Sequence, residues 1–186
     1  MSLPEVTLFG VLQFLGIVVL GSAAIAGISA APWVPTRKRE RTLLLSEIEL
    51  RPGMRVVDLG CGDGAFLFAA AQHFPNVDFT GYDISFLPLA IAYLRKLLGW
   101  KRYRNVHIRF GNLFAQDIST YDVVFAFLLS KCYPRLKQKL AREMKPNALA
   151  VFEAWALDGV TSARTVNHPG VLPIFFYRTE DLQRTV

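Results

Sequence analysis

The sequence predicts an α/β protein with a doubly wound sheet, and the order of its apolar segments carries that prediction. An apolar strand at 55–59 runs into a loop with alternating glycines at 58–64, and an apolar helical stretch follows at 65–74. A second strand, at 78–82, ends in Asp83. Strands and helices continue to alternate after it, as in a mainly parallel sheet with helices on both faces.

The later elements follow the same alternation, and the 186-residue length fits a single folded domain with a short extra element. We expect helices at 37–49, 86–98 and 134–144, and strands at 106–110, 121–127 and 148–154. After Trp155 there is room for one or two strands, with 171–177 the best candidate. The sequence therefore predicts a C-terminally truncated sheet.

The loop at 58–64 has the features of a site for a nucleotide cofactor. Gly60 and Gly62 let the backbone approach a ligand closely, and Gly64 begins a helix whose free N–H groups favour an anionic group. Asp83 follows the loop at about the spacing, roughly 20 residues, at which an acid binds ribose hydroxyls. Together, the loop and Asp83 predict a cofactor site at the ends of two neighbouring strands.

Residues 34–155 resemble the class I, seven-strand methyltransferases that depend on S-adenosylmethionine and have a Rossmann-like fold. The resemblance rests on the loop at 58–64, on Asp83, and on Gly111-Asn112-Leu113 after the third strand. It implies that S-adenosylmethionine is the cofactor, with its methionine moiety at the loop, its ribose at Asp83 and its adenine at the third segment. Asn112 stands where Asp is more usual, and its amide oxygen can still accept a hydrogen bond. The residues implied to bind the cofactor are Asp58, Gly60, Cys61, Gly62, Gly64, Asp83, Ile84, Asn112 and Leu113.

The acceptor side of the predicted pocket is apolar. After the fourth strand the chain has Ala126-Phe127-Leu128-Leu129, where enzymes that methylate nucleobases or glutamine commonly carry Asn/Asp-Pro-Pro-Tyr. Such a wall suits a lysine stem or a lipid-like acceptor. Glu153, Trp155 and Tyr133 can face this pocket, but no catalytic residue is assigned. The histidines are scattered, so no metal site is expected.

The N-terminal segment Val6–Ala31 has no charged residue and one strongly polar one, Gln13. As a helix it is long enough to cross a hydrocarbon core of about 30 Å. A cleaved signal peptide and a buried core helix are the alternatives, but no Lys or Arg precedes the segment. The basic cluster Arg37–Arg41 follows it, which favours a retained single-pass transmembrane anchor with the catalytic domain on the cytoplasmic side.

We therefore expect residues 1–36 to form a membrane anchor with an interfacial joint, and residues 37–186 to form the methyltransferase domain. The joint, Pro32–Thr36, lies between the apolar helix and the glycine loop. A similar segment occurs in the small membrane-anchored protein-lysine methyltransferases, whose known members modify the adenine nucleotide translocase and the c subunit of ATP synthase. This narrower resemblance implies a lysine of a membrane protein as the acceptor.

A net charge of +6 raises the question of a nucleic-acid partner. The basic residues between Arg95 and Arg104 are interleaved with Trp100 and Tyr103. Anionic lipid attracts such a patch, and aromatic side chains suit the membrane interface. We favour an anionic lipid surface over nucleic acid as the partner of this stretch.

Three functions are consistent with these features. The first is a membrane-anchored methyltransferase that acts on a lysine of a membrane protein. The second has the same chemistry, with a lipid, a quinone or another small amphiphile as acceptor. The third is a non-catalytic scaffold subunit that binds the cofactor, which the intact Asp58, Gly60, Gly62 and Asp83 disfavour.

Overall fold

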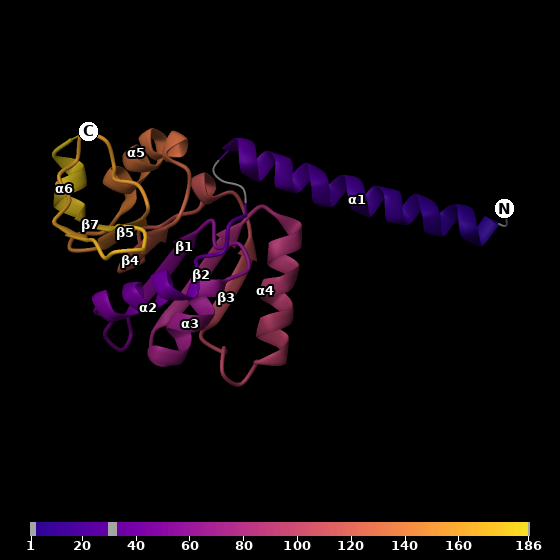
Figure 1. The fold of residues 1–186 in the computed structure, drawn as a ribbon, viewed down its shortest axis with the longest axis horizontal. Coiled ribbons are helices and arrows are strands. Elements are labelled where there is room, and N and C mark those ends of the chain that lie inside the picture. The colour runs from indigo at the N-terminus through magenta and orange to yellow at the C-terminus, as the bar shows by residue number, and fades with distance from the viewer. Residues whose placement is uncertain (1–2, 30–32, 186) are drawn as a thin grey trace.

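The computed structural model describes residues 3–29 and 33–185. The strands are β1 (Arg55–Leu59), β2 (Asp78–Asp83), β3 (Val106–Phe110), β4 (Val123–Ala126), β5 (Leu149–Glu153), β6 (Arg164–Val166) and β7 (Ile174–Arg178). The helices are α1 (Leu3–Ser29), α2 (Lys38–Glu47), α3 (Ala65–His73), α4 (Phe86–Leu98), α5 (Tyr133–Glu143) and α6 (Thr179–Gln183), with short 3-10 turns η1 (Leu113–Ala115) and η2 (Ser130–Cys132). Helices pack around the sheet, while α1 projects away from it (Figure 1).

The strands form one seven-stranded sheet in the order β3-β2-β1-β4-β5-β7-β6. The first five strands of that order are parallel, and β7 is antiparallel to both of its neighbours. The doubly wound α/β prediction is confirmed. The predicted truncation is wrong, because the chain after Trp155 supplies β6, β7 and α6 and so completes the sheet. These elements fit into a short segment because antiparallel strands need no crossover helix.

Alternate residues of the central strands face opposite sides of the sheet, and each side has its own core. On one side Val57 and Val124 pack with Leu136 and Leu140 of α5. The other core is built from the intervening strand residues and from apolar side chains of α2, α3 and α4, including Leu44, Val56, Phe66, Leu67, Ala70, Leu89, Ala92, Phe125 and Val151. Strands buried on both faces explain the nearly continuous apolar runs in the sequence.

The parallel strands end at a common edge of the sheet, and this edge carries the predicted site. The register pairs Asp58 with Gly81 and with Phe125, and Phe125 with Val151. Asp83 ends β2 and Glu153 ends β5 at the same edge. In open α/β sheets, ligands bind at the carboxyl ends of the strands where the strand order reverses, here between β1 and β4.

The N-terminal apolar segment forms α1, whose Ser22 hydroxyl accepts a hydrogen bond from the Phe86 N–H at the start of α4. Within the ranges 3–29 and 33–185, no helix is both long and apolar enough to cross a membrane, so the predicted transmembrane helix is not supported. The last two residues of the predicted span, 30–31, and Pro32 of the predicted joint lie outside the described residues.

We predict that Gly81→Ala destabilises the domain by about 1–3 kcal/mol through overpacking. A Cβ at this position in β2 would lie 2.5 Å from Leu67 Cδ1 and 2.6 Å from Cys61 Sγ. Denaturant unfolding measures the free energy of unfolding. Gly10→Ala in α1 is the matched control, since nothing lies within 4 Å of its added Cβ. Equal stability of the two variants would contradict tight packing behind the glycine loop.

Candidate active site

The glycine loop after β1 is held against the end of β2 by backbone hydrogen bonds. The N–H groups of Gly60 and Cys61 donate to Tyr82 O at 2.8 and 3.1 Å. Gly60 has a φ of +86°, and a Cβ there would lie 2.6 Å from Leu128 Cδ2, so a side chain does not fit. The loop therefore turns sharply at the sheet edge and keeps its backbone open to a ligand.

Asp83 ties the loop to the next turn through both carboxylate oxygens. Oδ2 accepts a hydrogen bond from Gly62 N at 2.8 Å, and Oδ1 accepts one from Ser85 N at 2.7 Å. Each carboxylate oxygen can accept a further hydrogen bond. The carboxylate is thus fixed in position with acceptor capacity left for a pair of hydroxyl groups, as a bound ribose requires.

Asp58 places a buried carboxyl at the bottom of the site, with only 3% of its surface exposed. Burial raises its pKa well above the usual value, and the nearby acids Asp83, Glu153 and Asp63 raise the pKa further. A cationic ligand would stabilise the ionised form of such a carboxyl. The acid-rich surroundings therefore fit S-adenosylmethionine, which carries a sulfonium and an ammonium group.

Asp63 anchors the loop to α4. Its Oδ2 lies 2.9 Å from Arg95 Nη2, and its Oδ1 accepts a hydrogen bond from Ala65 N at 3.2 Å at the start of α3. Arg95 also donates to the Asp63 carbonyl. Arg95 belongs to the basic stretch predicted to meet lipid, but it is engaged in holding the loop.

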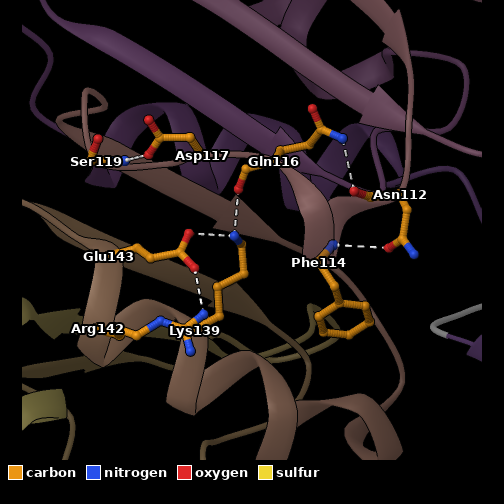
Figure 2. A network of polar contacts seen from close by, with 8 residues as sticks. All are labelled: Asn112, Phe114, Gln116, Asp117, Ser119, Lys139, Arg142 and Glu143. Carbon is orange, nitrogen blue, oxygen red and sulfur yellow. Dashed lines mark hydrogen bonds and ion pairs between the residues drawn. The ribbon is translucent and has the colours of Figure 1, made fainter.

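The Asn112 segment is positioned by a network that reaches α5 (Figure 2). Asn112 Oδ1 accepts a hydrogen bond from Phe114 N at 3.0 Å, and the Asn112 carbonyl accepts one from the Gln116 amide. The buried Lys139 donates to the Gln116 carbonyl and pairs with Glu143. Asn112 Oδ1, the oxygen predicted to bind adenine, therefore already caps η1. One of its lone pairs remains free to accept a hydrogen bond from a ligand.

One pocket at this edge of the sheet joins these groups. Of the predicted cofactor residues, it is lined by Asp58, Gly60, Cys61, Gly62, Asp83, Ile84, Asn112 and Leu113. Gly64 does not line it and is instead the N-cap of α3, with a φ of +71°. That these residues contact the cofactor stays a prediction.

One wall of the pocket was not predicted from the sequence. The pocket is also lined by residues that were expected to form a joint at the membrane surface, namely Trp33, Val34, Pro35 and Thr36. A Cβ on Gly62 would lie 2.9 Å from Trp33 Cδ1, so the indole packs directly over the loop. No local pattern reveals this contact, because the two residues are far apart along the chain.

Glu153 and Tyr133, named as possible pocket residues, are both buried, whereas Trp155 is 49% exposed. Both Glu153 oxygens and Tyr133 Oη lack a hydrogen-bond partner among the described residues. Burial raises the pKa of both groups, that of Glu153 to about 7. Within 3–29 and 33–185, no group of three or more His, Cys, Asp or Glu side chains is placed to hold a metal ion.

Comparison with known proteins gives consistent matches. The sequence profile of the ANTKMT methyltransferase domain matches residues 58–164. A protein-lysine N-methyltransferase from Saccharolobus islandicus is 33% identical over 130 residues, which cover 69% of this chain and 79% of that protein.

Solved structures match over most of the fold. An RNA methyltransferase from Salinibacter ruber, in complex with S-adenosyl-L-homocysteine, superposes with a TM-score of 0.73 at 25% identity, covering 78% of this chain and 94% of that one. An rRNA methyltransferase from Streptomyces viridochromogenes superposes with a TM-score of 0.62 at 15% identity, covering 83% and 90% of the two chains. The latter likeness concerns the fold alone.

The seven-stranded sheet and its acid-lined pocket define a class I methyltransferase that uses S-adenosylmethionine. Within that class, the chain belongs to the ANTKMT methyltransferase domain family.

We predict that Asp83→Asn weakens binding of S-adenosylhomocysteine at least tenfold. The substitution removes the negative charge and one acceptor oxygen, and hydrogen bonds to charged groups contribute about 1.5–3 kcal/mol each. Titration calorimetry measures the affinity. Asp78→Asn, at the exposed start of the same strand, is the matched control and should bind like the wild type. Unchanged affinity in the Asp83 variant would refute the ribose assignment.

Proposed function

We propose that the chain transfers the methyl group of S-adenosylmethionine to the amine of a lysine in a protein, and that this protein lies at a membrane. The observation that carries the acceptor class is the match to a protein-lysine N-methyltransferase along 79% of that protein's length. The acceptor side of the pocket supports it, because Trp33, Phe127 and Leu128 supply an apolar wall for a lysine stem.

When bound, S-adenosylmethionine supplies a methyl group already activated on a sulfonium. The protein then needs mainly to hold the acceptor nitrogen in line with that methyl group at near-attack distance. Asp83 and the glycine loop fix the cofactor side through their mutual hydrogen bonds. Residues 33–36 line the same pocket.

The exposed apolar surface supports a membrane location. Several side chains of α1 are more than half exposed, among them Leu8, Leu12, Phe14, Ile17 and Leu20, and they are spread around the helix. On α4 and the residue pair after it, Leu94, Leu97, Leu98 and Trp100 are also exposed. An apolar helix without a polar face needs an apolar environment to cover it.

The charges beside this surface support the cytoplasmic side. Arg37, Lys38 and Arg39 are exposed at the start of α2, and Lys101 and Arg102 follow α4. Basic residues near a membrane are attracted to the anionic lipid of the cytoplasmic leaflet by about 1 kcal/mol each. We therefore place the enzyme at a membrane, attached through α1, with its methyltransferase domain on the cytoplasmic side.

We predict that the purified chain, incubated with tritium-labelled S-adenosylmethionine and host-cell membranes, labels a discrete protein band. Mass spectrometry should then find the methyl group on a lysine. Asp83→Asn should reduce the labelling at least tenfold, because it weakens cofactor binding. Label that enters only the solvent-extractable fraction would contradict a protein acceptor and assign the activity to a lipid, a quinone or another amphiphile.

We further predict that the full chain floats with vesicles that contain anionic lipid, and that the double variant Leu12→Glu and Ile17→Glu does not. Charged side chains on the apolar helix oppose its burial, at a cost of several kcal/mol in total. The control introduces the same charges elsewhere on the surface, at the exposed His73 and Asn76. Flotation of the α1 variant at the wild-type level would contradict attachment through this helix.

A further inference from the structure

Two acidic side chains are buried together beside the cofactor pocket. Glu153, the last residue of β5, is 1% exposed, and Glu40 of α2 is 2% exposed. Both oxygens of Glu153 and Oε2 of Glu40 have no hydrogen-bond partner among the residues that the structure describes. Three buried acceptor oxygens are therefore unsatisfied by the described part of the chain.

The position of the pair links it to the cofactor pocket. Ala126 of β4 pairs with Phe152 of β5, so Phe127 and Glu153 are the next residues along adjacent strands. Phe127 lines the cofactor pocket, and so does Thr36, which lies near Glu153. Asp58, at the bottom of the same pocket, is close enough for Glu153 to raise its pKa.

The backbone directly after Glu153 is strained. Ala154 has a φ of +76°, in the left-handed region that residues other than glycine rarely adopt. Its N–H donates to Pro173 O at 2.9 Å, which holds the turn in place. Strain of this kind persists only where the surrounding structure holds it, and it is concentrated at functional sites.

Burial of acids without partners is costly. A buried carboxylate that lacks a hydrogen bond or a counter-charge destabilises the folded state, and most buried polar atoms in proteins are paired. Burial and the nearby Glu40 raise the pKa of Glu153 to about 7, and the nearby Thr36 hydroxyl and Arg41 guanidinium lower it only in part. Neither of these two groups completes a hydrogen bond of normal geometry to a Glu153 oxygen. A ligand that brings a positive charge and several N–H donors would satisfy the unpaired oxygens.

We propose that Glu153 and Glu40 form the binding site for the ammonium group of the acceptor, and that Glu153 takes its proton. This inference rests on the proposed function, since a lysine ammonium has one positive charge and three N–H donors. Those donors match the three unpartnered oxygens in number. Phe127, which follows β4 next to the end of β5 and lines the pocket, would contact the lysine stem.

A proton transfer precedes the methyl transfer. The ammonium first gives one proton to the Glu153 carboxylate, which leaves a neutral amine and a carboxylic acid. The amine lone pair then forms the N–C bond to the methyl group while the C–S bond breaks, and that electron pair stays on sulfur. The product is a methylated ammonium and a neutral thioether, and Glu153 later loses its proton to water. A Glu153 pKa of about 7 suits this base near neutral pH.

The direct test is the binding of n-butylammonium, a probe that has the stem and the charge of lysine. NMR titration at pH 7.5, with S-adenosylhomocysteine present, measures its affinity. Glu153→Gln keeps the shape of the side chain and removes its charge, and it should weaken probe binding at least tenfold. Glu40→Gln should also weaken it. Glu49→Gln, at an exposed position just beyond α2, is the matched control and should bind the probe like the wild type.

Cofactor binding distinguishes a local effect from misfolding. All three variants should bind S-adenosylhomocysteine within about twofold of the wild type, because neither Glu40 nor Glu153 lines the cofactor pocket. If Glu153→Gln does not fold, Glu40→Gln carries the test. Wild-type binding of the probe by the folded Glu153 variant, or equally tight binding of uncharged n-butanol by the wild type, would overturn the proposal.

Kinetics separate this proposal from the proposed function. With a protein substrate that the wild type methylates, Glu153→Gln should lower kcat at least tenfold, change the KM for S-adenosylmethionine much less than kcat, and remove the rise in rate through about pH 7. Groups near Glu153 that also bear on this profile are Glu40, Arg41, Asp58 and Tyr133. Lysine methylation with an unchanged kcat in this variant would refute the acid site and leave the proposed function intact. Probe binding at Glu153 without any lysine methylation would refute the lysine acceptor alone.

Discussion

The attachment of the glycine loop to the end of β2 is the constraint on which the site depends. Tyr82 O accepts hydrogen bonds from two loop N–H groups, and Asp83 accepts a third from Gly62. These bonds form only where β1 and β2 are parallel neighbours and end at the same edge of the sheet. Strand pairing in the core therefore sets the distance between the loop and the ribose-binding acid, so changes inside the domain reach the cofactor site.

Like charges at this edge explain the chemistry of the pocket. Asp83 and Glu153 both lie close enough to Asp58 to raise its pKa, and burial raises the pKa of Asp58 and Glu153. A pocket that holds several acids at low solvent exposure favours cations. The cofactor and the proposed acceptor are both cationic before reaction, and the methyl transfer leaves the thioether neutral. The same field that binds S-adenosylmethionine therefore binds its neutral product less strongly.

The sequence predicted those parts of the fold and site that depend on local patterns. The strand, glycine loop and acid at 55–64 and Asp83 lie within one βαβ unit, where spacing alone indicates their roles. The hairpin of β6 and β7 was underestimated, because β6 has three residues and no buried apolar run. The pocket wall at Trp33–Thr36 and the partnership of Glu40 with Glu153 were not predicted either. Both arise from contacts between distant segments, and single-sequence periodicity carries no signal for them.

A crystal structure of the full chain with bound S-adenosylhomocysteine would test the arrangement of cofactor and acceptor at the sheet edge most decisively. We expect the ribose hydroxyls at Asp83, the homocysteine moiety at the glycine loop below Trp33, and the sulfur directed toward the pocket side of Phe127 and Glu153. A ligand bound with its ribose away from Asp83, or with its sulfur directed away from Glu153, would contradict that arrangement.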